Sequence, residues 1–306
     1  MTARLDARLA LLLTLPPLMW AGNAVVGRLA VGHVPPLALN ALRWLLALAL
    51  LLPLGWRAIG TPQARREVLL RWRPLAVLGL LGVGCYNALQ YMALTTSTAL
   101  NVTLIASSLP VWMLAIGALF YREHPTRRSM LGAALSLAGV AVVLARGDAM
   151  QLAQVRLVPG DLLMLAAIIA WAFYSWRLAR PHPLLSGKAR PDWDWAAFLL
   201  VQTMFGVVWG GAFAIAEAVV APAPILWSPM VLLALAYVAI GPSLIAYRCW
   251  GLGVVSAGPA MAAFFGNLTP LFAAVLSAAV LGEAPHLYHG LAFALIVAGI
   301  VVSARR

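Results

Sequence analysis

The sequence predicts an all-α integral membrane protein with ten transmembrane helices, arranged as two inverted five-helix repeats around a central cavity. Three observations predict this fold: a very apolar composition, an internal repeat and a one-sided distribution of basic residues. Of the 306 residues, 63% are hydrophobic and only 10% are charged, which is too few polar side chains to cover a soluble domain of this length. Lipid must therefore cover most of the surface.

The internal repeat is visible when the sequence is compared with itself at an offset of 160 positions. Four matches need no gap: Pro110 with Pro270, Glu123 with Glu283, Pro125 with Pro285 and Gly139 with Gly299. Matches at one fixed offset indicate a duplicated unit. We therefore expect an N-terminal repeat at residues 1–147 and a C-terminal repeat at residues 148–306.

Apolar runs long enough to cross a bilayer give ten candidate spans. They lie near residues 9–31, 36–56, 73–94, 97–121, 128–146, 160–179, 194–219, 229–250, 257–281 and 287–304. The first resembles a signal peptide, since Arg4 and Arg8 precede an apolar run, but it lacks an Ala-x-Ala cleavage site and continues to Val31. We therefore expect it to remain as a span.

Basic residues fall almost entirely on one side of these spans. Sixteen of the 21 Lys and Arg residues lie in or beside the links on the side of the two chain ends, whereas only Arg146 and Arg156 lie in links on the other side. The side that is richer in Lys and Arg is normally cytoplasmic. The sequence therefore predicts a multi-pass protein of the bacterial inner membrane with both termini in the cytoplasm. This topology explains the net charge of +12, and no nucleic-acid partner is expected.

Each repeat contains five spans, an odd number, so the second repeat must cross the membrane in the opposite direction. Inverted repeats occur in many transporters, where the substrate site lies near the bilayer midplane between the repeats. Duplication also occurs in membrane proteins that do not transport. The topology therefore favours a transporter of a small molecule and leaves a membrane scaffold or receptor as the alternative from another class.

Polar side chains inside the spans are the candidate substrate ligands, because they are costly in lipid and usually face a protein interior or water. The candidates are Trp20, Asn23, Tyr86, Gln90, Tyr91, Asn101, Trp171, Tyr174, Tyr247 and Asn267. The alternative is that some of them form hydrogen bonds between helices or anchor a span at the membrane interface, as Trp and Tyr often do.

Two prolines and one arginine have unusual positions within the spans. Pro110 and Pro270 lie near the middle of their spans and each removes a helical hydrogen bond, so they could bend a helix during transport or form a static kink. Arg43 is the one basic residue placed deep in a span. It could donate to backbone carbonyl groups or loops as a structural contact, or it could bind the carboxylate of a substrate.

The sequence offers no candidate catalytic residue, metal site or cofactor site. The nine acidic residues and five histidines lie in links or near span ends, which argues against a buried proton relay, a site for lipophilic cations and an enzyme. His286 and His289 could share a metal, but an exposed link explains them better. Cys85 and Cys249 lie in apolar runs and are expected to be packing residues.

Several short motifs occur along the chain, some of them in both repeats. They are Met19-Trp20-Ala21-Gly22-Asn23 and Arg43, then Ala93-Leu94 with Pro110, Glu123-x-Pro125, Gly132 and Gly139, and finally Gly258-Pro259 with Pro270, Glu283-x-Pro285 and Gly299. Together they resemble the EamA-type branch of the drug/metabolite transporter superfamily over essentially the whole chain. The resemblance implies ten helices in two inverted repeats, with a central cavity lined by helices 1, 3, 4, 6, 8 and 9. The candidate ligands fall on those helices.

Within that family, the aromatic residues of the expected cavity are similar to those of aromatic amino-acid exporters. The small multidrug-resistance relatives use a membrane-embedded Glu in the first helix, where this chain has Trp20 and Asn23. We therefore predict a monomeric inner-membrane exporter of amino acids, aromatic or neutral, and related metabolites that works by alternating access. A carrier of nucleosides or sugars is the alternative within transport, and coupling to protons is left open.

Overall fold

The computed structural model of the chain describes residues 6–30, 32–148, 150–153, 155–281 and 286–304. Six residues used in the sequence predictions lie outside the described residues: Arg4, Val31, Glu283, Pro285, Arg305 and Arg306. Every regular element in the described part of the chain is a helix.

The helices divide into two series along the chain. The first comprises α1 (Ala7–Ala30), α2 (Pro36–Gly55), η1 (Trp56–Ala58), α3 (Pro62–Leu70), α4 (Trp72–Leu78), η2 (Gly79–Cys85), α5 (Tyr86–Thr96), α6 (Ala99–Ser107), α7 (Leu109–Tyr121) and α8 (Arg127–Leu144). The second comprises α9 (Met150–Ala153), α10 (Pro159–Ala179), η3 (Pro183–Leu185), η4 (Gly187–Ala189), α11 (Trp195–Val220), α12 (Pro229–Val238), η5 (Ala239–Ile245), α13 (Ala246–Ala257), α14 (Pro259–Gly266), α15 (Thr269–Leu281) and α16 (Leu287–Ala304).

The apolar helices bear out a multi-pass membrane protein. Among the described residues, eight helices are long and apolar enough to cross a membrane, and α6 with α7 would make a ninth if this pair, bent by 41°, is one span. These nine coincide with the second to tenth predicted spans. The first predicted span falls on α1, a helix of 24 residues. The count of ten transmembrane helices stays a prediction.

Helices and irregular segments recur at the offset of the sequence repeat. The first residues of α6, α7 and α8 precede those of α14, α15 and α16 by 160 positions in each case. The same interval separates two π-helical segments, η2 at residues 79–85 and η5 at residues 239–245. A π-helical turn shifts the hydrogen-bond pattern of a helix and is often found at functional sites. The recurrence therefore includes local irregularities as well as whole helices.

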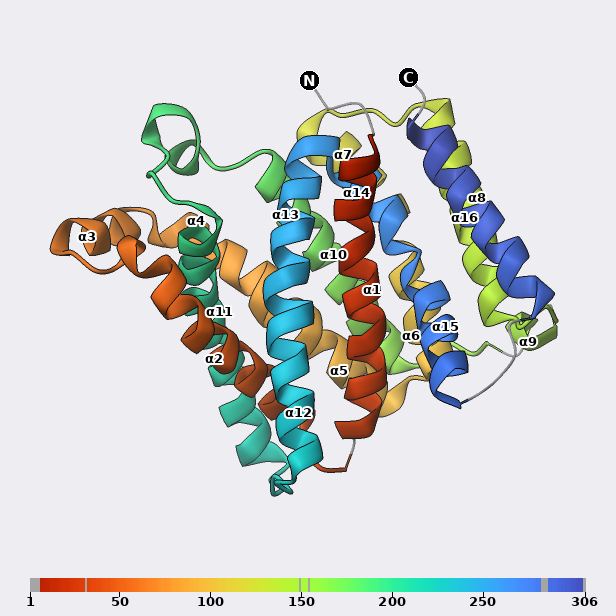
Figure 1. The fold of residues 1–306 in the computed structure, drawn as a ribbon, viewed down its shortest axis with the longest axis horizontal. Helices are drawn as coiled ribbons and strands as arrows, with labels where there is room; N and C mark the ends of the chain where they lie inside the picture. Colours follow the sequence, from red (N-terminus) through yellow and green to blue (C-terminus); the bar gives the residue numbers. More distant parts are fainter. Residues whose placement is uncertain (1–5, 31, 149, 154, 282–285, 305–306) are drawn as a thin grey trace.

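α8 and α16 form a close antiparallel pair at one side of the molecule (Figure 1). A Cβ atom at Gly132 would lie 2.7 Å from the carbonyl oxygen of Gly299, and a Cβ atom at Gly139 would lie 2.8 Å from that of Ala292. A shift of 160 positions exchanges these two contacts with each other. Small residues allow membrane helices to approach closely, so Gly132, Gly139 and Gly299 are packing positions between α8 and α16.

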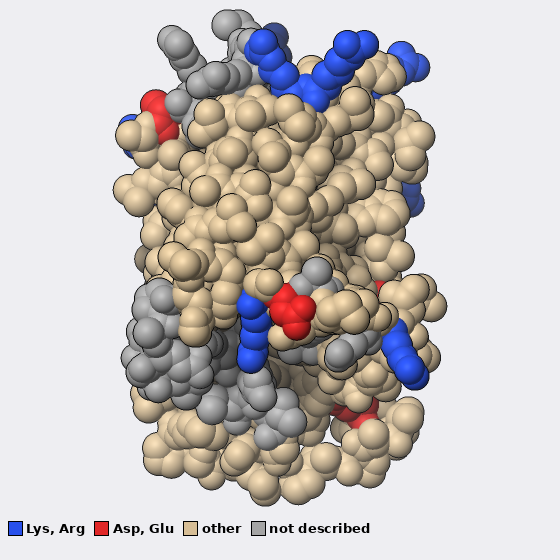
Figure 2. Space-filling model, turned by 90° about the vertical axis from the view of Figure 1, so that its right-hand side faces the viewer, with Lys and Arg blue, Asp and Glu red and all other residues tan. Residues whose placement is uncertain are grey.

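The charges and apolar side chains are arranged as expected for a protein within lipid. α1 begins and α16 ends at the same end of the molecule (Figure 1). On the face formed by α8 and α16, Lys and Arg side chains gather at that end, above a broad area that is neither basic nor acidic (Figure 2). Large apolar side chains elsewhere are exposed, with Leu119 at 77% and Leu233 at 73%. Water would disfavour such a surface, whereas lipid matches it.

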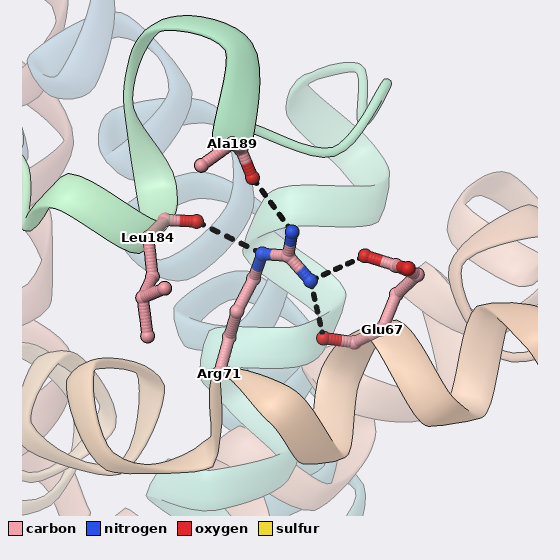
Figure 3. A network of polar contacts seen from close by, with 4 residues as sticks. All are labelled: Glu67, Arg71, Leu184 and Ala189. Atoms are coloured by element: carbon pink, nitrogen blue, oxygen red, sulfur yellow. Dashed lines mark hydrogen bonds and ion pairs between the residues drawn. The ribbon is translucent and has the colours of Figure 1, made fainter.

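Arg71 holds the link between α10 and α11 against α3 (Figure 3). Its Nε atom donates to the carbonyl oxygen of Leu184 at 2.8 Å, and Nη2 donates to that of Ala189 at 2.6 Å. Nη1 donates to the backbone and the carboxylate of Glu67. The link therefore adopts an ordered conformation in which one side chain binds both of its short helical turns.

We expect Arg71→Ala to release this link and to accelerate tryptic cleavage after the exposed Lys188. Because the Arg71 side chain is only 11% exposed and donates four hydrogen bonds, we also expect the thermal midpoint to fall, by about 1 kcal/mol of stability for each bond that water does not replace. Local opening depends on the few contacts that hold a segment, so the cleavage rate should respond more strongly. Limited proteolysis followed by mass spectrometry measures the rate, with Arg66→Ala, an exposed position on α3, as the control. Equal cleavage rates for the two variants would contradict this role of Arg71.

Candidate functional site

Six aromatic side chains meet in the interior of the bundle and form what we call the aromatic cluster. They are Trp20 of α1, Tyr86 of α5, Trp171 and Tyr174 of α10, and Tyr247 and Trp250 of α13. The ring centroid of Trp171 lies 5.0–5.5 Å from those of the five other rings. Ring pairs at these distances stabilise one another beyond the area that they bury. The structure thus brings together five candidate ligands that the sequence places on four separate spans.

Two rings of the cluster donate hydrogen bonds to the π-helical segments. Trp20 Nε1 donates to the carbonyl oxygen of Pro242 in η5 at 3.3 Å, and the hydroxyl group of Tyr247 donates to that of Gly82 in η2. Residues 82 and 242 are separated by the repeat offset of 160. Irregular helical backbone leaves carbonyl groups that other protein donors must satisfy within a membrane. Each π-helical segment is therefore bound by an aromatic donor from the other half of the chain.

Arg43 of α2 is fully buried and hydrogen-bonds to four side chains, which together with it form the Arg43 network. Its Nε atom donates to Ser243 Oγ at 2.6 Å. Its Nη1 atom lies 3.0 Å from Asn87 Oδ1, 3.3 Å from Asn23 Oδ1 and 3.3 Å from the Tyr91 hydroxyl oxygen. The network connects α1, α2, α5 and η5 through neutral side-chain oxygens, rather than through the backbone carbonyls or loops that the sequence suggested for a structural role.

Trp44 lies between the Arg43 network and the aromatic cluster. The Cζ atom of Arg43 is 5.3 Å from the ring centroid of Trp44, and the ring of Trp44 is 4.9 Å from that of Tyr247. A buried cation and a group of aromatic rings are therefore adjacent in the same interior region.

Two candidate amides bind other parts of the protein. Asn101 Nδ2 donates to the carbonyl oxygen of Arg156 at 2.8 Å and to Asp161 Oδ2 at 2.9 Å. Asp161 lies in the first turn of α10 and is 4% exposed. Asn267 Nδ2 donates to Ser136 Oγ of α8 at 2.8 Å. The structure does not bring Asn101 or Asn267 into contact with the aromatic cluster, and their role in substrate binding stays a prediction.

The remaining candidates lie on α5 and at helix breaks. Gln90 is partly buried on α5, one turn after Tyr86. Pro110 is in the first turn of α7, directly after the 41° bend between α6 and α7, and Pro270 is in the first turn of α15. Both prolines therefore begin the second helix of an interrupted span, and a role in gating stays a prediction.

Two cavities lie outside the aromatic cluster. One of about 280 Å³ is lined by Asn101, Ser108, Asp161 and apolar side chains. The other, of about 430 Å³, lies between α8, α9 and α16 and includes Tyr288. No cluster ring lines either cavity. In this conformation the cluster rings pack against one another.

Several interior polar residues were not selected from the sequence. Asn40 and Gln202 are each 1% exposed, and Gln202 Oε1 accepts a hydrogen bond from the Tyr174 hydroxyl group at 3.2 Å. Their signal was present, because both are polar residues inside predicted spans. Ser243 is also a polar residue inside a predicted span, but its contact with Arg43 could not be predicted, because it depends on a π-helical turn that has no distinctive sequence pattern.

Comparison with known proteins relates this chain to a family of transporters. The model of the EamA-like transporter family matches residues 8–145 and 158–305. A solved crystal structure that is 24% identical superposes with a TM-score of 0.76, covering 98% of this chain and 99% of the other, which shows a common fold.

Three curated relatives are aligned over nearly their whole length. An uncharacterised transporter of Archaeoglobus fulgidus is 26% identical over 98% of both chains. The aromatic amino acid exporter YddG of Ancylobacter novellus is 28% identical over 94% of this chain and 93% of its own. A probable amino-acid metabolite efflux pump of Salmonella typhimurium is 25% identical over 98% and 95%. With both family matches extending over most of its length, this chain belongs to the EamA-like transporter family.

Proposed function

We propose that this transporter exports amino acids, aromatic or neutral ones, and related metabolites by alternating access. The observation that carries the proposal is the contact of Trp171 with five other rings directly beside the Arg43 network. Aromatic rings offer apolar contact to a side chain and cation–π attraction to an ammonium group, while amides and hydroxyl groups offer hydrogen bonds. Two relatives named for amino-acid export add support.

In the proposed site, the substrate binds between the rings of the aromatic cluster after they separate. Trp20, Tyr86 and Trp171 contact the substrate side chain, while Gln90 and Asn23 offer hydrogen bonds to its polar groups. The predicted contacts of Asn101 and Asn267 with the substrate would need their amide groups to leave Asp161 and Ser136, which they bind in this conformation. Access then changes when the two halves of the chain move relative to each other around this site.

We further propose that residues 1–147 and 148–306 are inverted copies. The reciprocal contacts between α8 and α16 support this arrangement, since the repeat offset exchanges them. The two reciprocal hydrogen bonds at the π-helical segments support it as well. Each half contributes one π-helical carbonyl group and one aromatic donor. Opening the site toward one side of the membrane would therefore break one of these two hydrogen bonds, and opening it toward the other side would break its counterpart.

The proposed location is the bacterial inner membrane, with both termini in the cytoplasm and the protein acting as a monomer. The sequence places most basic residues on the side of the chain ends. The first residue of α1 and the last residue of α16 lie at the same end of the structure, as this topology requires (Figure 1). Cytoplasmic loops of membrane proteins carry the excess of Lys and Arg.

Counterflow in proteoliposomes tests the substrate class. Vesicles loaded with unlabelled phenylalanine should accumulate labelled phenylalanine, and an excess of external aromatic or neutral amino acids should compete. Nucleosides and sugars should not compete. If labelled nucleosides or sugars undergo counterflow in vesicles loaded with the same compound and phenylalanine does not, they replace amino acids as the substrate. No accumulation of any of these compounds would favour a scaffold or receptor. Repeating uptake with and without a pH gradient distinguishes proton coupling from facilitated export.

A further inference from the structure

Arg43 places a positive charge in the protein interior without an acidic partner. Its side chain is 0% exposed, and it makes no ion pair in the described part of the chain. Arginine stays protonated in proteins, so this charge cannot be removed by releasing a proton. A buried charge is costly unless hydrogen bonds and an opposite charge compensate it. The four neutral oxygens of the Arg43 network supply only the first of these.

The hydrogen bonds of Arg43 are distributed unevenly over its guanidinium group. Nε and Nη1 account for the contacts with Ser243, Asn87, Asn23 and Tyr91, whereas Nη2 has no partner among the described residues. The bonded nitrogens hold the group in one orientation. Nη2 is thus a fixed donor with two hydrogens to offer, whereas the two hydrogens of Nη1 already face three acceptors.

Other unpartnered polar atoms lie close to Arg43 along α2. Asn40 lies three residues before Arg43 and Trp44 one residue after it, so residues 40 and 44 are one turn apart and flank Arg43 on α2. Both side-chain polar atoms of Asn40 and the Nε1 atom of Trp44 are buried without a hydrogen-bond partner in the described residues. Counting Arg43 Nη2, three of these four unpartnered atoms are donors, although Asn40 faces α11, where its Nδ2 atom would lie 3.6 Å from a Cβ atom at Gly210.

We propose that Arg43 binds the carboxylate of the transported amino acid through Nη2, and so selects substrates that carry a carboxylate. This inference rests on the proposed export of amino acids. Trp44 lies between the guanidinium group and Tyr247, so a carboxylate at Arg43 leaves the rest of a small amino acid within reach of the aromatic cluster. Decarboxylated amines offer the same ring and ammonium group but leave the Arg43 charge uncompensated.

A purely structural role for Arg43 makes a different prediction. If Arg43 only connects α1, α2, α5 and η5, its replacement would lower stability, but the wild-type protein would not distinguish ligands by their carboxylate. The distinguishing measurement is therefore made first on the wild-type chain, and the variants refine it.

The experiment compares L-phenylalanine, L-phenylalaninamide and phenethylamine as ligands of the purified full-length protein by isothermal titration calorimetry. All three carry the ring and an amine, and only phenylalanine carries a carboxylate. We expect both amines to bind at least roughly tenfold more weakly, as expected for the loss of a charge-assisted hydrogen bond. Arg43→Gln should weaken phenylalanine to the level of the amines and leave the amines unchanged. Arg71→Gln, which removes an arginine network outside the site, should bind like wild type.

The outcomes separate this inference from the proposed function. If phenylalanine binds and the amines bind equally well, the assignment of Arg43 is wrong while amino-acid export stands. If no amino acid binds or undergoes counterflow, the proposed function itself fails. Should Arg43→Gln not fold, the comparison of ligands on the wild-type protein decides the question, and Arg43→Lys, which keeps the charge, provides a second variant that should retain part of the preference for phenylalanine.

Discussion

Gly132→Val is expected to separate α8 from α16 and to destabilise the protein by about 3 kcal/mol, since overpacking a close contact forces backbone shifts. A Cβ atom at position 132 would lie 1.8 Å from Ser303 Oγ and 2.7 Å from the carbonyl oxygen of Gly299. The serine side chain could rotate away, but the backbone oxygen could not move without displacing α16. Thermal unfolding in detergent, followed by intrinsic fluorescence, measures the effect.

Gly290→Val is the matched control for this substitution. Gly290 is exposed on α16, and a Cβ atom there would have no neighbour within 4 Å. The same chemical change should therefore leave the thermal midpoint close to that of the wild type. Similar midpoints for Gly132→Val and Gly290→Val would show that α8 and α16 are not closely packed at Gly132.

Trp171→Ala should have the largest effect on the interior of the protein. Trp171 is 2% exposed and contacts the five other rings of the aromatic cluster. Removing a buried aromatic side chain typically costs 3–5 kcal/mol, so we expect about that loss of stability. We also expect loss of phenylalanine counterflow, because the ring is the hub of the proposed site.

Two further variants separate stability from transport. Trp227→Ala removes an exposed indole in the link before α12 and should change neither the thermal midpoint nor counterflow. Trp171→Phe keeps an aromatic ring at the hub, so it should fold and transport at a reduced rate. Wild-type counterflow by Trp171→Ala would contradict a site at the aromatic cluster.

The sequence predicted the all-helical class and the positions of the apolar spans, while the inverted arrangement of two repeats stays a prediction. Pro110 and Pro270 lie at corresponding breaks in the spans, and the Gly132 and Gly139 positions form the contact with α16. The resemblance to EamA transporters is confirmed by the family matches. The pattern could not show η2 and η5, because a π-helical turn depends on backbone hydrogen bonds that many residue types permit.

The sequence predicted which polar side chains lie inside the spans, but it did not predict which of them meet in one site. The cost of a polar side chain in lipid indicates that it has a partner, but it does not indicate which partner. Trp20 and Tyr247 both contact Trp171 in the aromatic cluster, whereas Asn101 donates to Asp161 near the start of α10. The direction of each side chain depends on helix rotation and on contacts between distant spans, which one sequence does not reveal.

Photo-crosslinking with a diazirine analogue of phenylalanine tests the central claim most directly, because it locates the bound amino acid on the chain. After irradiation and proteolysis, mass spectrometry should find adducts on α1, α5, α10 and α13, near Trp20, Tyr86, Trp171 and Tyr247. Excess unlabelled phenylalanine should suppress them. Suppressible adducts confined instead to the 430 Å³ cavity around Tyr288, or to the 280 Å³ cavity beside Asn101, would contradict amino-acid binding at the aromatic cluster.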